Sequence, residues 1–202
     1  PRRPMPRLQL NKSSLAHETA QLRTFERFLP SLDLKRQQLM AERAKEERGV
    51  RALEEQVRTF AERVGHDLPM LANDAIGLDG LVELKRWELG TENVVGTKLP
   101  TLERIEVAVR PYSAMAKPHW VDDVARLLHD MLETHMRIEV AKQRVKRLDA
   151  AVVTITQRVN LFDKVLIPTA RANIKKIRIY LNEEEMAAVV RSKIAKRKRA
   201  AA

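Results

Sequence analysis

The stretch that decides the fold is residues 124–166, VARLLHDMLETHMRIEVAKQRVKRLDAAVVTITQRVNLFDKVL. Apolar residues recur along it at alternating spacings of three and four, and twelve of the thirteen positions on this stripe are apolar. A stripe that keeps its phase over six heptads is typical of a left-handed coiled coil rather than of a helix in a globular core. The seam residues expected on this helix are Met131, Ile138, Val145, Leu148, Val152, Ile155, Val159, Phe162 and Leu166.

The stripe shifts by one residue near Pro168, where Ile167 and Ala170 begin a new series with the same spacing. Such a slip changes the supercoil locally, and a proline inside a helix removes one backbone hydrogen bond. We therefore predict a helix over residues 119–190 that is kinked near Pro168, followed by a basic tail over residues 191–202.

Residues 11–64 follow the same rule, with eleven of fifteen stripe positions apolar, after a basic tail at residues 1–10. The seam residues expected here are Leu22, Leu29, Leu32, Leu53 and Val57. Three charged exceptions, Arg36, Arg43 and Glu46, fall in the middle of the stripe. Charges in a seam weaken its packing, so they either pair across to the second helix or mark a contact with an accessory subunit.

The segment between the two helices, residues 65–118, contains five of the six glycines and four of the nine prolines. Residues 81–89, 94–99 and 104–109 have strand character, residues 90–93 resemble a turn, and Pro100 should interrupt the second half. The predicted fold is therefore mainly α: a long antiparallel two-helix coiled coil formed by the N- and C-terminal helices, with a small β-hairpin-containing insert between them.

The charge is strongly basic, at +11, and residues 119–202 alone carry +8. Basic segments favour acidic protein surfaces, nucleic acid or anionic lipid as partners. Nucleic acid is the less favoured of these because the tail has no aromatic residue on which bases could stack. A solvated helix end, whose cations suit the C-terminal helix dipole, is the alternative to a protein contact. The candidate contact residues in the tail are Arg191, Lys193, Lys196 and Arg197.

An enzymatic site is not indicated anywhere in the sequence. The chain has no cysteine and no glycine-rich phosphate loop, and His17–Glu18 lacks the second histidine of a zinc-protease helix because position 21 is Gln. No apolar run approaches the roughly 18 residues that a membrane span needs. We expect no catalytic, cofactor-binding or metal-binding residue, no cofactor, and a soluble intracellular chain.

Three stretches resemble the D subunit of V/A-type ATPases, and in particular its bacterial form. They are FLPSLDLKRQQL at 28–39, ENVVGTKLP at 92–100 and RVNLFDKVLIP at 158–168. The likeness extends in the same order over most of the chain and is weakest over residues 40–75 and at both ends. The stretch at 158–168 is the most specific, since heptads by themselves are common.

The resemblance implies a non-catalytic rotor shaft that couples ATP synthesis or hydrolysis to H⁺ or Na⁺ transport. The paired terminal helices would then enter a hexamer of nucleotide-binding subunits A and B, with Arg191, Lys193, Lys196 and Arg197 as candidate contacts. The F subunit would bind the stalk, and the C subunit would link it to the membrane ring on the cytoplasmic side. Two alternatives stay open: a structural coiled-coil scaffold and a nucleic-acid-associated coiled coil.

Overall fold

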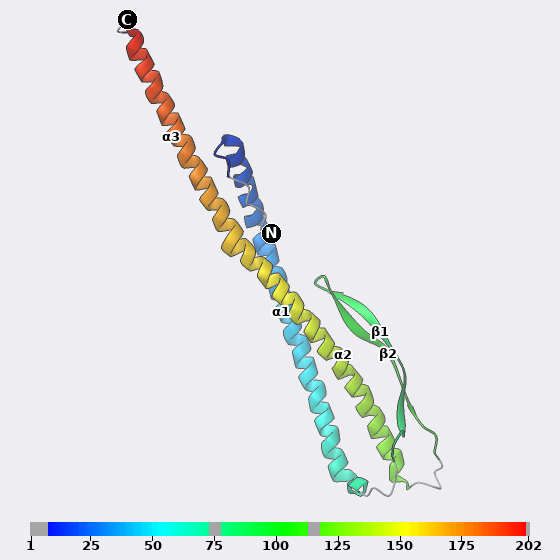
Figure 1. Ribbon diagram of the computed structural model, residues 1–202. Coiled ribbons are helices and arrows are strands. Elements are labelled where there is room, and N and C mark those ends of the chain that lie inside the picture. Colours follow the sequence, from blue (N-terminus) through cyan, green and yellow to red (C-terminus); the bar gives the residue numbers. More distant parts are fainter. Residues whose placement is uncertain (1–7, 73–77, 113–117, 201–202) are drawn as a thin grey trace. The chain divides into compact units, whose positions relative to one another are not determined.

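The computed structural model describes residues 8–72, 78–112 and 118–200 (Figure 1). Helix α1 (Lys12–Asp67) and a 3₁₀ turn (Pro69–Ala72) precede strands β1 (Val82–Val94) and β2 (Thr97–Val109). Helix α2 (Trp120–Leu161), a π-helical turn (Phe162–Leu166) and helix α3 (Ile167–Ala200) follow. The predicted fold class is confirmed: long helices at both ends flank a two-stranded antiparallel hairpin. Most of the tail expected at residues 1–10 lies outside the described residues.

The chain divides into two compact units, which we describe separately. The terminal unit comprises residues 1–36 and 154–202, and the hairpin unit comprises residues 37–153. Helix α1 contributes to both units. Asn11 begins it as an N-cap, since its side-chain oxygen accepts a hydrogen bond from the Ser14 backbone N–H at 2.7 Å.

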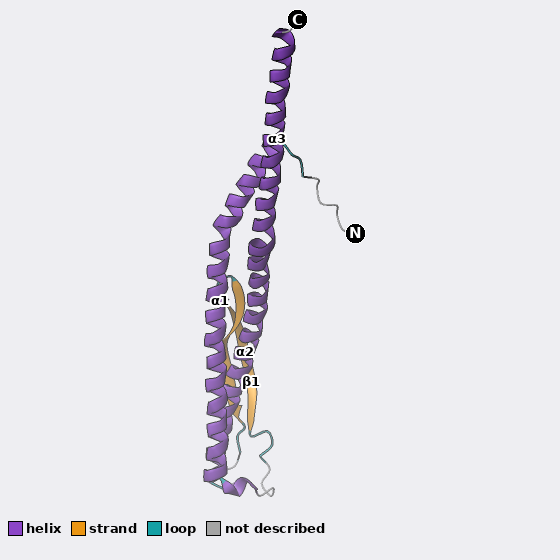
Figure 2. Ribbon diagram, turned by 90° about the vertical axis from the view of Figure 1, so that its left-hand side faces the viewer, coloured by secondary structure: helices purple, strands orange, loops and turns teal. Residues whose placement is uncertain are grey.

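Helices α1 and α2 run antiparallel in the hairpin unit, with β1 and β2 beside α2 (Figures 1 and 2). Two ion pairs fix the direction: Lys142 Nζ lies 3.0 Å from Glu54, and Arg144 lies 2.8 Å from Glu46. Residue numbers therefore increase along α2 while those of the partners along α1 decrease, as antiparallel helices require. The antiparallel arrangement of the sequence prediction holds within this unit.

The terminal unit pairs α1 with α3 in the same sense. Arg171 lies 2.7 Å from Glu26, Asn173 donates to Glu18 at 3.3 Å, and Lys12 lies 3.7 Å from Glu185. The aromatic rings of Phe25 and Phe162 also meet across this pair. Contacts between the two helices of the terminal unit thus extend from the start of α1 to the π turn.

The predicted seam residues lie on the covered side of their helices. Ile138, Leu148, Ile155 and Val159 are buried, and the other predicted seam residues are half-buried. Leu39, which lies on the α1 stripe, is also buried, as are four residues of the series that begins after the shift: Ile167, Ala170, Ile174 and Ile177. Thr134, the polar member of the stripe, is buried, and its hydroxyl donates to the Asp130 carbonyl at 2.7 Å.

A small apolar core closes the hairpin unit where the hairpin and α2 begin. Val121 is fully buried there and packs with Leu68, Leu81, Trp120 and Val124. Strand β1 begins directly after Leu81, so this core holds the base of the hairpin against the helices.

The hairpin turn differs from the sequence prediction. Strand β1 continues through residues 90–93, and the turn is Val95–Gly96, because Val94 pairs with Thr97. Both turn residues have positive φ, 51° for Val95 and 81° for Gly96, as a two-residue type I′ loop requires. Pro100 does not interrupt β2 either: in a two-stranded sheet every strand is an edge, where a residue without an N–H is tolerated.

The irregularity near Pro168 takes the form of a π turn. The Ile167 backbone N–H bonds to the Phe162 carbonyl, five residues back, so one extra residue is accommodated. That extra residue accounts for the one-residue shift of the stripe and keeps Val159 and Ile167 both buried. Helix α3 then continues to Ala200, beyond the end expected near residue 190, because no residue after Pro168 breaks a helix.

Candidate interaction surfaces

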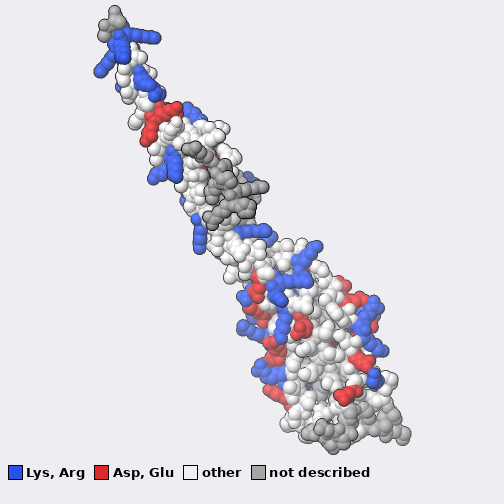
Figure 3. Space-filling model, in the orientation of Figure 1, with Lys and Arg blue, Asp and Glu red and all other residues white. Residues whose placement is uncertain are grey.

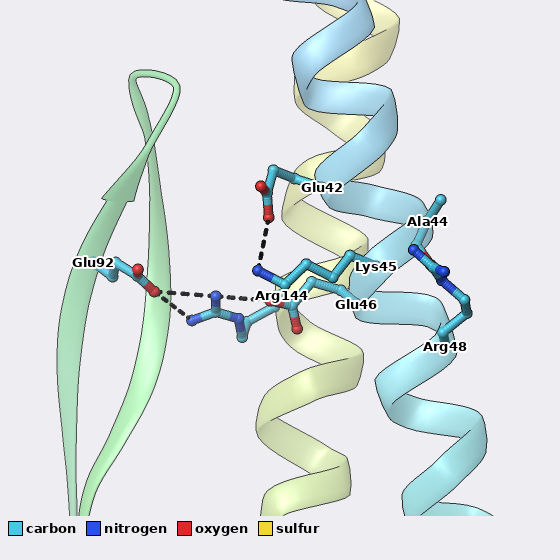
Figure 4. Close-up of polar contacts among 7 residues, drawn as sticks. All are labelled: Glu42, Ala44, Lys45, Glu46, Arg48, Glu92 and Arg144. Carbon is cyan, nitrogen blue, oxygen red and sulfur yellow. Dashed lines mark hydrogen bonds and ion pairs between the residues drawn. The ribbon is translucent and has the colours of Figure 1, made fainter.

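Arg144 on α2 is the polar centre of the hairpin unit (Figure 4). Its guanidinium lies 2.8 Å from the Glu46 carboxylate of α1 and 3.1 Å from that of Glu92 in β1. It also donates to the Pro100 carbonyl of β2 at 3.1 Å. One side chain, 15% exposed, thus connects four elements of this unit.

The charge of Arg144 is stabilised where it lies. Burial alone would lower the pKa of the guanidinium, but hydrogen bonds to Glu46 and Glu92 outweigh it and raise that pKa above its ordinary value. One turn further along α2, Arg147 donates to the Lys98 carbonyl at 3.1 Å. These two arginines, at i and i+3, hold the outer half of the hairpin on α2 through backbone carbonyls of β2.

Of the three charged exceptions in the middle of the α1 stripe, two pair across to α2. Arg43 donates from Nε to Asp149 and also lies 2.8 Å from Glu47, while Glu46 pairs with Arg144. Arg36 instead lies 2.6 Å from Asp33 on its own helix. The Arg36 Nε atom is buried and has no hydrogen-bond partner within the described part of the chain.

The tail residues Arg191, Lys193, Lys196 and Arg197 are all exposed on α3, and Figure 3 shows a cluster of cations at the C-terminal end. Large apolar side chains alternate with them: Met186 is 68% and Val190 54% exposed, with Val189 and Ile194 similar. This apolar stripe was not predicted from the sequence. The sequence feature that indicates this stripe is the i, i+4, i+8 spacing of Met186, Val190 and Ile194. This spacing continues an apolar helix face beyond the last seam residue.

Beyond Glu185, α3 has no partner helix among the described residues. Lys12, at the first turn of α1, is the ion-pair partner of Glu185. The exposed stripe and the cations around it, residues 186–197, therefore form a surface that is covered by nothing in the described chain; we call it the α3 end surface.

The two units differ in charge. The terminal unit has 20 Lys and Arg against 7 Asp and Glu, a net charge of +13, whereas the hairpin unit has 18 against 20, a net charge of −2. Across residues 8–72, 78–112 and 118–200, no three His, Cys, Asp or Glu side chains are grouped as metal ligands would be. None of the described helices has a segment long and apolar enough to cross a bilayer.

Within each unit, long helices pair antiparallel around a narrow seam, and in the hairpin unit two arginines fix a β-hairpin on α2. These features define an antiparallel coiled-coil protein. The family follows from sequence comparison: residues 14–197 match the family described as the D subunit of ATP synthase, and the chain belongs to it. This confirms the resemblance found in the sequence.

Curated relatives agree with this membership. The V-type ATP synthase D subunit of Borreliella burgdorferi is 32% identical over 192 residues, which cover 95% of each chain. The protein of the same name from Chlamydia felis is 31% identical over 198 residues, covering 95% of this chain and 93% of the relative. The one from Chlamydia muridarum is 31% identical over 198 residues and 95% of both chains.

Proposed function

We propose that this chain is the rotor shaft in the central stalk of a V/A-type ATPase or ATP synthase. It would couple ATP synthesis or hydrolysis to H⁺ or Na⁺ transport while catalysing nothing itself. The observation that carries the proposal is the α3 end surface, where a helix continues without a partner in the described chain while exposing both cations and large apolar side chains. Membership of the D-subunit family supports it.

In this proposal the α3 end surface lies inside a hexamer of nucleotide-binding subunits A and B. Arg191, Lys193, Lys196 and Arg197 face acidic residues of the hexamer wall, and Val190 and Ile194 supply apolar contact. Each orientation of the shaft then stabilises a different nucleotide state in each catalytic subunit, and hydrolysis in turn drives rotation.

The other stalk partners are proposed to be the F subunit, and the C subunit as the link to the membrane ring on the cytoplasmic side. Arg36, Arg43 and Glu46 are the proposed contact with the F subunit. Arg36 is the most informative of the three, because a buried Nε without a partner is a destabilising arrangement that an acceptor from another protein would relieve. Arg43 and Glu46 already have partners across the helix pair.

The shaft assignment is tested by co-expressing the chain with the other subunits of the complex and measuring co-purification and ATP-driven ion uptake into vesicles. Val190→Asp with Ile194→Asp should abolish incorporation, because two carboxylates would replace apolar contacts. Val153→Asp is the matched control, since Val153 is an equally exposed helical valine, at 56%, in the hairpin unit. A double variant that still assembles and transports ions like the control would refute the proposal.

Salt dependence tests the charge part separately. Replacing Arg191, Lys193 and Lys196 by Gln should weaken assembly at low ionic strength, and the difference from the parent should shrink as salt screens exposed charges. An identical loss at every ionic strength would contradict the electrostatic contribution while leaving the apolar contact in place.

A further inference from the structure

The β-hairpin has two outer edges, and their backbone groups can be assigned from the register. Val94 and Thr97 close the two-residue loop as a hydrogen-bonded pair. Along an antiparallel ladder, such pairs alternate with pairs whose N–H and C=O groups point away from the partner strand. The outward groups near the turn therefore belong to Leu89, Thr91 and Asn93 in β1, and to Lys98, Pro100 and Leu102 in β2.

The outer edge of β2 is closed. The carbonyls of Pro100 and Lys98 accept hydrogen bonds from Arg144 and Arg147 of α2, each at 3.1 Å, which agrees with the outward direction that the register assigns to them. Pro100 is also buried and has no N–H to donate. A further strand could pair with this edge only by displacing the two arginines.

The outer edge of β1 is open. Leu89, Thr91 and Asn93 are exposed, and no group of another described element bonds to their outward N–H and C=O groups. Proteins usually protect such an edge with proline, charged residues, bulges or a covering element. None of these three residues is charged or proline, and both register shifts of the sheet lie before Leu89. Residues 89–93 of β1 are therefore an edge that can accept a further strand.

A glycine and a carboxylate indicate which residues a partner strand should carry. A Cβ added at Gly90 would overlap the Glu103 carboxylate, so the Glu103 side chain crosses directly over this glycine. Glu103 is exposed and forms no ion pair with any described residue. Because Gly90 has no side chain of its own, a lysine or arginine on a neighbouring strand could reach this carboxylate without obstruction.

The opposite face of the same edge is apolar. Side chains alternate between the two faces of a strand, so Trp87 and Leu89 lie on the face opposite to Gly90. Trp87 is 51% and Leu89 is 42% exposed, and apolar residues of an added strand would remove part of both from water. A partner strand that matches both faces has a cation opposite Gly90 and apolar residues before and after it.

We propose that the outer edge of β1, residues 89–93, pairs with an extended segment of a partner protein that alternates basic and apolar residues. β1 then becomes the central strand of a three-stranded sheet. Main-chain hydrogen bonds supply affinity and the two side-chain faces supply specificity, as is usual when a strand adds to a sheet edge. The inference depends on the hairpin alone and uses neither the α3 end surface nor the rotor assignment.

Other occupants fit this edge less well. A helix cannot satisfy the outward groups of Thr91 and Asn93, because its own N–H and C=O groups are bonded internally. A second copy of β1 would add its own Glu88 and Glu92 to a face that already holds these two carboxylates and that of Glu103, and like charges oppose such pairing.

The test begins with amide hydrogen exchange in the isotope-labelled full chain. The outward amides of Leu89, Thr91 and Asn93 should exchange faster than those of Gly90 and Glu92, which bond to β2. A capped peptide, Thr-Lys-Val-Lys-Val-Lys-Thr, is then added to saturation. It should slow exchange of the three outward amides at least about tenfold and move their proton signals downfield, with much smaller signal changes at the two inward amides.

Backbone changes test whether the contact is a strand pairing. Methylation of the peptide nitrogens in the alternate set of residues that faces β1 should abolish binding, and methylation of the other set should leave it intact. On the protein, Thr91→Pro removes one outward N–H and should also abolish binding. Pro100, the cross-strand partner of Thr91, already occupies an outward position. Thr91→Val keeps the N–H and is the matched control.

Charge changes test the complementarity. Glu103→Gln should weaken peptide binding about two- to fivefold, the usual range for an exposed ion pair. Glu62→Gln removes an exposed carboxylate of α1 that forms no ion pair with a described residue, and should leave binding unchanged. A peptide with Glu in place of every Lys should bind at least about tenfold more weakly than the basic peptide.

Several outcomes would overturn the proposal. These are absence of binding, equal effects of the two methylated peptides, equal weakening by Glu62→Gln, or equal binding of the acidic peptide. Concentration-dependent protection of the outward amides in the chain alone would assign the edge to a second copy and would overturn it as well. Because only the hairpin and a peptide take part, this result and the assembly test of the rotor proposal can fail independently.

Discussion

The rings of Phe25 and Phe162 meet edge to face across the terminal unit, with centroids 5.5 Å apart and ring planes at 81°. Phe162 is also the first residue of the π turn, and its carbonyl accepts the hydrogen bond from Ile167 that defines this turn. The aromatic contact therefore fixes the seam at the point where the helix changes its phase.

This contact should be measurable as a coupling energy. In a double-mutant cycle of Phe25→Ala and Phe162→Ala, the free energies of unfolding should show a coupling of about 0.5–1.5 kcal/mol, the usual value for an aromatic pair. Guanidinium denaturation gives the four free energies. A cycle of Phe60→Ala with Phe162→Ala, which joins residues of different units, is the control, and an equal coupling there would contradict a specific contact.

Loss of Arg144 should release the hairpin. Arg144→Met removes the contacts to Glu92 and Pro100 and leaves Glu46 without its partner, at a cost of about 1–3 kcal/mol for a largely buried charge contact. Hydrogen exchange of the β1 and β2 amides should then accelerate by roughly ten- to a hundredfold. Lys146→Met, on the exposed side of α2, is the control and should not change exchange in the hairpin.

Val95 should be the place where the hairpin is most easily stabilised. A β-branched residue at a φ of 51° is in the left-handed region, which costs about 1–2 kcal/mol relative to a residue that adopts it readily. Val95→Asn creates the Asn-Gly pair that type I′ turns prefer, and should raise the free energy of unfolding by about 1 kcal/mol. Val94→Asn, one residue earlier in the strand, should give no such gain in thermal or denaturant unfolding.

The titration of Tyr112 should depend on Asp122. The Tyr112 hydroxyl donates to the Asp122 carboxylate, and this hydrogen bond, with burial and the nearby negative charge, raises the pKa of Tyr112 above 10.0. Since the folded-state pKa exceeds the unfolded one, the stabilising contribution is present below about pH 10 and is lost as pH rises through the raised value.

The chain has only two tyrosines, so a Tyr180→Phe background isolates the signal of Tyr112. In that background, ultraviolet titration of tyrosinate should give a lower pKa when Asp122→Asn is added, because the charged acceptor is gone. An unchanged titration curve would show that Asp122 does not hold the hydroxyl.

The helices could be predicted from the sequence because their pattern is long and local. The heptads through Ile138, Leu148 and Ile155 predicted covered positions, and the shift at Ile167 predicted an irregularity near Pro168. A π turn could not be identified in advance, because a one-residue slip is also compatible with a kink. The turn at Val95 is not indicated by the sequence, because valine rarely has a positive φ. Residues 90–93, Gly-Thr-Glu-Asn, have a composition more typical of a turn, so the sequence predicts the turn there.

The polar contacts were beyond sequence reasoning because they depend on register. Nothing local indicates that Arg43 lies opposite Asp149, or that Glu46 and Glu92 share Arg144. The α3 end surface was predicted only in part. The sequence predicts its cations as contact residues, but it does not by itself show that the apolar series beginning at Met186 continues as an exposed stripe.

The π turn has a consequence for how this chain tolerates insertions and deletions. In a long helical pair, one added residue normally rotates everything after it by about 100° and turns the buried face outward. Here the turn already absorbs one residue between Val159 and Ile167, with buried positions restored on both sides. Related chains that differ in length by a single residue in this helix should therefore place the gap at this turn, and a chain lacking the extra residue should carry an uninterrupted α-helix in its place.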